Sequence, residues 1–526
     1  MRQRWPAHPF IFASMPILAL MASNLGVVPP IQVVRPLTLA LLSAFLLLLL
    51  FRSLLHDRAK AGVLASTCVI LFFSYGHTHT VSLAVLSVLL QAVFDIRAGS
   101  SLAAWLHPFL TSMFAGVFLL ILRAVRRRIR RPGGITQLLN LVATFTLLYP
   151  VVQILRSEFS LREYQAAPSL SEILQSRMDE GETSPDVYYI ILDGYAAERT
   201  LQEVYGYENQ DFLHFLSAQG FYVASESRSN YAQTILSLAS SLNFDYLDKI
   251  LGGARANDVN ALIPLLRNNQ VRRRVADEGY QFIAFSTGYL RTEVPDADLF
   301  LQPGVESAGN LESLMIETTF LRAVESLAGA VGLRFPYPGY EPHRQRVLFT
   351  LEQLPRIAEI PGPKFVFAHL LIPHPPFVFG ADGEEVPQTR RYQLEDGSDF
   401  QGTREEYIEG YRNQVAYVNS RLAEIIPEIL AASSPDPIIV IQGDHGPGAG
   451  LNWDSPSAEG LSERFQILNA IRLPGPEPGL LYPDMSPVNT FRMILNRYFG
   501  TTLALLPDRS YFSSPAKPLE LQPVQP

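Results

Sequence analysis

The feature that most constrains the fold is a set of apolar runs in the first 156 residues. There are five of them, each close to the ~20 residues that cross the hydrocarbon core of a bilayer. A further apolar stretch, 81–94, is shorter and is open to interpretation as a re-entrant or interfacial segment or as a sixth span. The sequence therefore predicts a membrane domain over residues 1–156 with about five helices. The runs lie at about 9–28, 36–55, 61–80, 102–124 and 134–155.

Charge divides the chain at the same place. The first 156 residues hold 14 Lys+Arg and 2 Asp+Glu, a net charge of +12, whereas the other 370 hold 28 and 48, a net charge of −20. An acidic aqueous part argues against nucleic acid as a partner, because phosphate binding needs a basic surface. The one cysteine, Cys68, lies in an apolar run, which excludes a cysteine-rich zinc site or a cysteine nucleophile in the aqueous part.

The basic residues also predict an orientation. Six arginines lie within 123–131, between the fourth and fifth runs, and the positive-inside rule places that loop in the cytoplasm. The basic residues at the N-terminus and in the loop around 52–60 agree with five spans. We therefore expect a multi-pass protein of the plasma (inner) membrane whose C-terminal domain, after about residue 157, is extracytoplasmic.

The aqueous part alternates strand-like and helix-like segments after a polar linker, 157–185. The clearest helix is 404–430, with apolar residues at helical spacing on one face. Such alternation predicts an α/β fold, an α/β/α sandwich with a largely parallel sheet over 186–513. The proline-rich tail, 514–526, is expected to be irregular. The predicted strands are 186–192, 280–286, 363–370, 437–443 and 464–473.

Two of these predicted strands are followed directly by metal-ligand side chains. Asp193 follows the run VYYIIL, and Asp444 and His445 follow IIVIQG. Because ligands at the carboxyl ends of parallel strands meet in one crevice, we expect these three side chains to converge. Two carboxylates and an imidazole suit a divalent cation such as zinc or manganese.

A hydroxyl and two further imidazoles complete the candidate set. Thr234 opens a helical pattern, where the helix N-terminus favours an anion and eases ionisation of a hydroxyl, although a threonine there is more commonly a simple helix cap. His374 lies between prolines in a loop and is placed to touch a substrate or a leaving group. His369 lies inside a strand-like run, where a structural role and a functional one are equally plausible.

Four motifs in this order, LDGY, NYAQTILSLASSLN, HPPF and GDHG, resemble the alkaline phosphatase superfamily. The resemblance is closest to its membrane-anchored sulfatase-like branch, which includes lipoteichoic acid synthases and phosphoethanolamine transferases. It implies that Asp193, Thr234, Asp444 and His445 are metal ligands, that Thr234 is also the nucleophile, and that His374 binds substrate.

The chain departs from that pattern in two respects. It lacks the C/S-x-P-x-R motif that sulfatases need, so sulfate-ester hydrolysis is not expected. No histidine follows His445, so a complete second metal site is not expected either, and His369 is the additional candidate ligand.

We therefore predict a membrane-bound phosphoryl-group transferase with one divalent metal ion, zinc or manganese, acting on a lipid or lipid-linked envelope substrate through Thr234. A phosphatase or phosphodiesterase of the same superfamily is the alternative enzyme, because the same residues would serve it. A catalytically inactive envelope scaffold is the non-enzymatic alternative. A transporter is disfavoured, since the apolar runs hold few ionisable residues.

Overall fold

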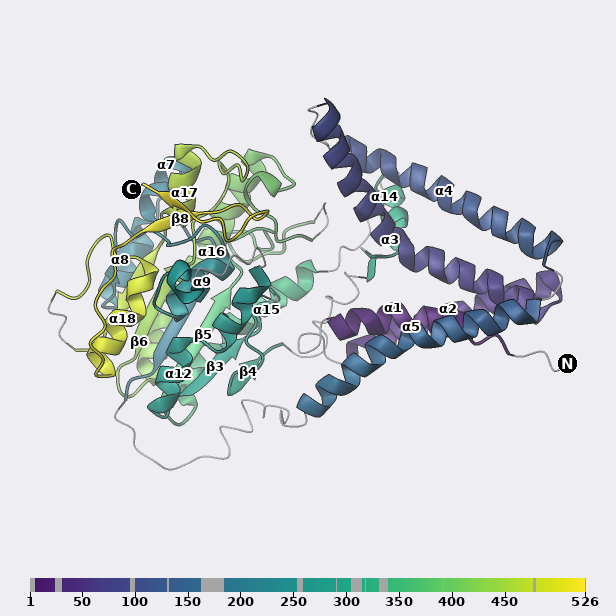
Figure 1. Cartoon of the computed structure of the whole chain (residues 1–526). Helices are drawn as coiled ribbons and strands as arrows, with labels where there is room; N and C mark the ends of the chain where they lie inside the picture. The colour runs from purple at the N-terminus through teal and green to yellow at the C-terminus, as the bar shows by residue number, and fades with distance from the viewer. Residues whose placement is uncertain are drawn as a thin grey trace. The chain divides into compact units, whose positions relative to one another are not determined.

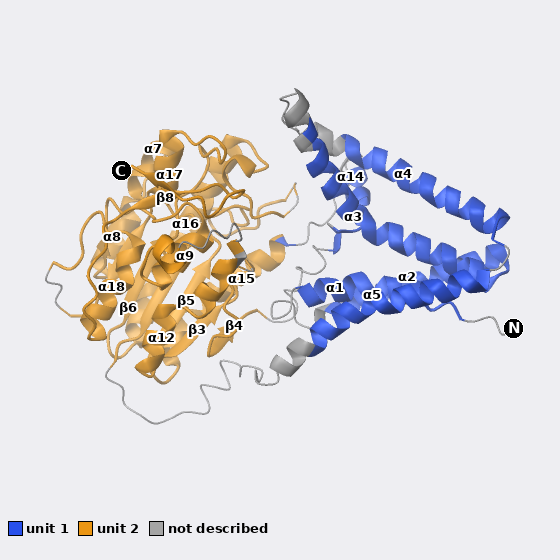
Figure 2. Ribbon diagram, viewed as in Figure 1, with its two compact units in different colours: residues 1–165, 308–339 blue, residues 166–307, 340–526 orange. Residues whose placement is uncertain are grey.

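The computed structural model describes residues 5–23, 31–94, 100–129, 132–161, 184–252, 259–289, 291–303, 315–316, 318–330, 339–388, 390, 392–475 and 479–525. It divides into two compact units (Figure 2), one formed by residues 1–165 and 308–339 and the other by 166–307 and 340–526. The expected linker, 157–185, lies mostly outside the described residues. We describe each unit by itself.

The first unit is helical, and its helices follow the predicted apolar runs. Small buried side chains, among them Ala13, Ala44 and Ala61, let the helix backbones approach closely, as in membrane helix pairs. Large apolar side chains such as Leu46 and Phe145 are exposed, as expected for a surface that faces lipid. The helices are α1 (His8–Ser23), α2 (Ile31–Leu55), α3 (Arg58–Phe94), α4 (Ser100–Arg127) and α5 (Pro132–Leu161).

Four of these helices, α2 to α5, are long and apolar enough to cross a membrane, and α1 is a shorter apolar helix. The stretch 81–94, whose role the sequence left open, is not a separate segment. This stretch is neither a sixth span nor a separate re-entrant segment, because it continues α3 without interruption. No proline or glycine lies within 81–94 to break the helix that begins at Arg58.

One piece of the C-terminal sequence groups with the membrane helices. The segment 308–339 contains α14 (Leu321–Ala330), which packs beside α3 and α4. The backbone N–H of Phe320 donates to the Phe72 carbonyl over 2.8 Å, and the Phe320 ring lies 5.0 Å from the Tyr75 ring. The sequence did not predict this return of the chain.

The second unit is built on a mixed sheet in the order β2-β7-β6-β1-β5-β3-β4. Strands β1, β5, β6, β3 and β4 are mutually parallel, with β1 at the centre between β5 and β6, whereas β7 is antiparallel to β6. The strands are β1 (Val187–Leu192), β2 (Tyr222–Val223), β3 (Gln281–Phe285), β4 (Leu299–Leu301), β5 (Lys364–Leu370), β6 (Ile438–Gly443) and β7 (Asn469–Arg472).

Helices cover both faces of this sheet (Figure 1), which confirms the predicted α/β/α sandwich. Strand β1 shows why its sequence is continuously apolar: Tyr188, Ile190 and Leu192 enter one core, while the alternating residues enter the other. One core lies under α7 (Glu198–Tyr205), α8 (Gln210–Ala218), α15 (Tyr340–Gln353) and α16 (Arg404–Ala432); the other lies under α9 (Thr234–Leu242), α10 (Leu247–Ile250), α11 (Ile263–Arg267), α12 (Gln270–Asp277) and α18 (Pro487–Tyr498).

Two predictions need correction in this unit. The strand expected at 464–473 begins only at Asn469, because α17 (Ala458–Phe465) occupies its start, and the strand runs antiparallel. The tail is not wholly irregular, since β9 (Gln522–Val524) pairs with β8 (Ser510–Phe512). The helix predicted at 404–430 is confirmed as α16, which begins with a capping box between Thr403 and Glu406.

Candidate active site

The candidate site lies at the carboxyl end of the three central strands. Asp193 follows β1, His369 is the penultimate residue of β5, and Asp444 and His445 follow β6. The register pairs Ile191 with His369 and Leu192 with Gly443, so these strands end at the same level. The sheet thus brings together side chains that lie up to 252 positions apart in the sequence.

Thr234 reaches this cluster from α9. Its hydroxyl lies 3.0 Å from Nε2 of His445, and the residue is almost completely buried. It is the first helical residue, whereas the N-cap is Gln233, and no side chain caps the helix. Thr234 is therefore not the simple helix cap that the sequence offered as an alternative role, and its hydroxyl is directed into the site.

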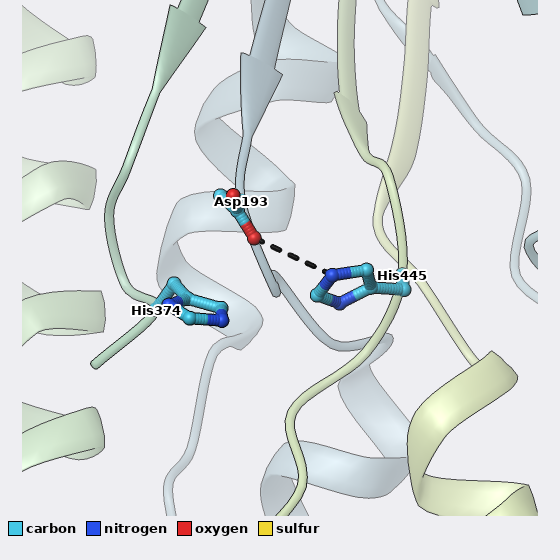
Figure 3. Close-up of side chains that lie close together, drawn as sticks. All are labelled: Asp193, His374 and His445. Carbon is cyan, nitrogen blue, oxygen red and sulfur yellow. Dashed lines mark ion pairs between the residues drawn. The ribbon is translucent and has the colours of Figure 1, made fainter. Parts of the chain in front are cut away.

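The carboxylates present oxygens suited to a cation. His445 Nε2 lies 3.5 Å from Asp193 Oδ1 (Figure 3) and 3.4 Å from Asp444 Oδ2. Both of these oxygens are buried, and within the described residues neither has a hydrogen-bond partner. Since an uncompensated buried carboxylate oxygen is costly, this donor set fits a bound divalent cation.

Hydrogen bonds fix the orientation of these ligand atoms. The N–H of Gly194 donates to Asp444 Oδ1 over 3.0 Å, and His445 Nδ1 lies 2.9 Å from the Gly446 carbonyl. A proton on that Nδ1 leaves the Nε2 lone pair facing the carboxylates, as metal ligation requires.

His369 and His374 both join the cluster. His369 Nε2 lies 3.2 Å from Asp193 Oδ2, and its Nδ1 lies 3.1 Å from the Thr292 hydroxyl. The backbone N–H of His374 donates to the Asp193 carbonyl over 3.0 Å, which ties its loop to the end of β1. Two groups of three residues have possible ligand atoms within 4.8 Å of one another: Asp193, His374 and His445, and Asp193, His369 and Asp444.

The sequence reasoning missed two residues, Asp396 and Arg464. Arg464 forms a buried ion pair with Asp396 through Nη1, and its Nη2 lies 3.2 Å from His445 Nε2. Asp396 also faces His374, with 3.7 Å between Oδ2 and Nε2. Neither residue follows an apolar run in the sequence that would have identified it as a candidate. Asp396 lies in a loop, and Arg464 lies in α17.

These charges set the protonation states. Burial raises the pKa of Asp193, but the charge of His374 and the hydrogen bond from His369 outweigh it and hold that pKa below its ordinary value. Burial also raises the pKa of Asp396, but the charge of Arg464 outweighs burial and lowers that pKa to about 2. Burial and Arg464 lower the pKa of His445, which favours the neutral imidazole that binds metal.

No family model and no curated protein matches this chain. Several solved structures are similar to it. The C-terminal periplasmic domain of phosphoethanolamine transferase EptC from Escherichia coli, in complex with Zn, is 15% identical over 66% of this chain and 94% of its own, with a TM-score of 0.40. The lipoteichoic acid synthase LtaP from Listeria monocytogenes is 12% identical over 66% of this chain and 83% of its own, with a TM-score of 0.37.

A phosphonate monoester hydrolase of Agrobacterium radiobacter is 16% identical over 62% of this chain and 80% of its own, with a TM-score of 0.38. All three belong to the alkaline phosphatase superfamily, which the four sequence motifs resemble. TM-scores below 0.5 at these identities describe a general likeness and assign neither a substrate nor a reaction to this chain.

Proposed function

We propose that this protein is a membrane-bound, metal-dependent phosphoryl-group transferase that uses Thr234 as its nucleophile. One observation carries the proposal: the Thr234 hydroxyl lies 3.0 Å from a histidine nitrogen that also faces two carboxylate oxygens with no hydrogen-bond partner among the described residues. A hydroxyl among metal ligands, at the N-terminus of a helix, has the two features that activate it for attack on phosphorus.

Asp193, Thr234, Asp444 and His445 would hold one divalent cation, zinc or manganese, given their oxygen and imidazole donors. When bound, the cation lowers the pKa of the hydroxyl and stabilises charge on the phosphoryl oxygens. His369 contributes by orienting Asp193, because it lies 3.2 Å from the Oδ2 of that carboxylate.

The reaction has two halves. Thr234 Oγ loses its proton to water and forms a bond to phosphorus as the bond to the leaving oxygen breaks, and His374 is placed to protonate that oxygen. An acceptor hydroxyl then attacks the phosphorylated threonine, which releases Thr234. Arg464 supports both halves, since its guanidinium lies beside His445 and can pair with the phosphoryl oxygens.

The membrane unit supports an extracytoplasmic site. Phe320, from the chain that follows the last span, contacts α3 at Tyr75. Tyr75 lies 17 residues from Arg58, about 25 Å along the helix at ~1.5 Å per residue, and thus most of the ~30 Å hydrocarbon thickness away from the basic residues around 52–60. The positive-inside rule then places the C-terminal part outside the plasma membrane. A lipid or lipid-linked envelope substrate follows from the anchor, because tethering raises its local concentration.

The test is detection of a phosphorylated Thr234. Purified full-length protein with Mn²⁺ or Zn²⁺ is incubated with para-nitrophenyl phosphate or bis-para-nitrophenyl phosphate, quenched in acid, digested and analysed by mass spectrometry. We expect an adduct on the peptide that contains Thr234 in the wild type and in Thr234→Ser, and none in Thr234→Ala. Ser217→Ala, which removes an exposed hydroxyl from α8, is the matched control. An adduct that persists in Thr234→Ala would refute the nucleophile.

A further inference from the structure

A cavity of about 300 Å³ lies beside the candidate site, at the N-terminal end of α16. Two residues of its wall are sequence neighbours of site residues: Pro375 follows His374, and Glu395 precedes Asp396. The cavity therefore shares two loops with the site, although it presents different side chains.

One aromatic residue, Tyr407, contacts both the cavity wall and the site. Phe377 and Phe400 line the cavity, and their rings lie 5.4 Å and 5.0 Å from the ring of Tyr407. The Tyr407 hydroxyl donates to Asp396 Oδ1 over 2.6 Å. Gly410 allows this packing, because a Cβ there would lie 2.2 Å from the Phe377 ring.

The wall combines aromatic rings with neutral hydrogen-bonding groups. Among the described residues of the wall the one cation is Arg390, which already donates to both carboxylate oxygens of Glu406, over 2.9 Å and 2.8 Å. Two further carboxylates, Glu395 and Glu409, give the described part of the wall a negative charge that disfavours phosphate, sulfate or a nucleotide. The amide side chains of the wall are Gln388, Gln393, Gln401 and Asn413. Gln388 Nε2 already donates to the Phe377 and Val386 carbonyls, and Gln401 Nε2 donates to Glu395 over 3.4 Å.

We propose that this cavity binds a sugar ring of a glycan, and that the glycan is the acceptor of the phosphoryl group. Sugar hydroxyls both donate and accept, as do amide side chains, which carry both functions. The apolar C–H face of a sugar ring matches Phe377 and Phe400. The volume lies at the lower end of the ~300–1,000 Å³ of ligand pockets, enough for a sugar ring and far more than a small amine occupies.

This inference rests on the proposed function, since the sugar in the cavity would hold a neighbouring hydroxyl of the same glycan at Thr234. The hydroxyl oxygen then bonds to phosphorus as the bond from phosphorus to Thr234 Oγ breaks, and the hydroxyl proton passes to the threonine oxygen. The products are a phosphorylated glycan and the free Thr234 hydroxyl.

The experiment is saturation-transfer NMR on the full-length protein in nanodiscs. The probes are methyl glycosides and disaccharides of glucose, galactose, mannose and N-acetylglucosamine, with ethanolamine and choline as the competing chemistry. We expect saturation on the C–H face of at least one saccharide. Gln401→Ala and Phe400→Ala should weaken its binding by roughly tenfold or more. Gln202→Ala, an exposed amide on α7 outside the cavity, is the matched control and should bind as the wild type does.

The bound saccharide should also accelerate loss of the adduct from Thr234, and Gln401→Ala should abolish that acceleration while melting at the wild-type temperature. If the adduct forms but no saccharide binds, or if only the amines bind, the cavity assignment is wrong and the proposed function stands. If no adduct forms but a saccharide binds in a Gln401-dependent manner, the cavity assignment stands and the transfer reaction is wrong.

Discussion

Replacing Asp444 by asparagine should stabilise the metal-free protein and abolish its response to metal. Asp193 and Asp444 hold ligand oxygens within 4.8 Å of each other in a buried site. At an effective dielectric constant of about 20, two unit charges at that distance repel by about 3 kcal/mol. The amide oxygen of the new asparagine can still accept from Gly194, and its NH₂ can donate to Asp193 Oδ1, which has no hydrogen-bond partner within the described part of the chain. Because hydrogen bonds from Gly194 to Asp444 and from His369 to Asp193 already offset part of the repulsion, we expect a net gain of about 1–2 kcal/mol.

The same change should remove the gain from metal binding, since a neutral amide is a weaker ligand than a carboxylate. A cation at a hundred times its dissociation constant stabilises the native state by about 2.7 kcal/mol. For a unit of about 330 residues, unfolding entropy of ~2.1 cal/mol/K per residue converts 1 kcal/mol into about 1–2 °C. Metal should thus raise the wild-type melting temperature by about 4 °C and leave that of Asp444→Asn unchanged.

The assay is differential scanning fluorimetry of the full-length protein in detergent, after treatment with a chelator and again after addition of Mn²⁺ or Zn²⁺. Asp248→Asn, at an exposed aspartate of α10, is the matched control and should behave as the wild type in both states. A metal-free Asp444→Asn protein that melts below the wild type and still responds to metal would refute this account of the site.

Two further predictions concern groups around the site. Burial, with a smaller contribution from the Arg346 charge, lowers the pKa of His343 to about 3. The folded ring therefore stays neutral where the unfolded chain takes up a proton, so the free energy of unfolding falls by up to about 1.4 kcal/mol per pH unit as the pH drops from about 6.5 towards 3. Denaturant titrations at pH 6 and pH 4 should show a smaller fall in the free energy of unfolding for His343→Gln than for the wild type. An equal fall in the two proteins would contradict the prediction. Asp396→Asn should lower the free energy of unfolding by about 3–5 kcal/mol, because it leaves the Arg464 guanidinium buried without its partner. Asp396→Asn combined with Arg464→Met should recover much of that loss in a double-mutant cycle, and strictly additive losses would show that the two side chains are not coupled.

The sequence alone determined the features that depend on local pattern. The length of the apolar runs predicted the membrane helices, and the run VYYIIL predicted β1, because a strand buried on both faces is apolar at every position. The rule that parallel strands end at one edge then predicted that Asp193, Asp444 and His445 meet, and the structure brings them together with Thr234.

Only the tertiary structure decided what depends on contacts between segments distant in sequence. Asp396 and Arg464 carry no local signal, and they join the site because the 396 loop and α17 fold over the end of the sheet. The antiparallel β7, the pairing of β9 and the return of 308–339 to the membrane helices are likewise set by packing partners rather than by periodicity. Local pattern specifies which face of an element is buried, whereas the side chains that meet across that face follow from the packing of the whole chain.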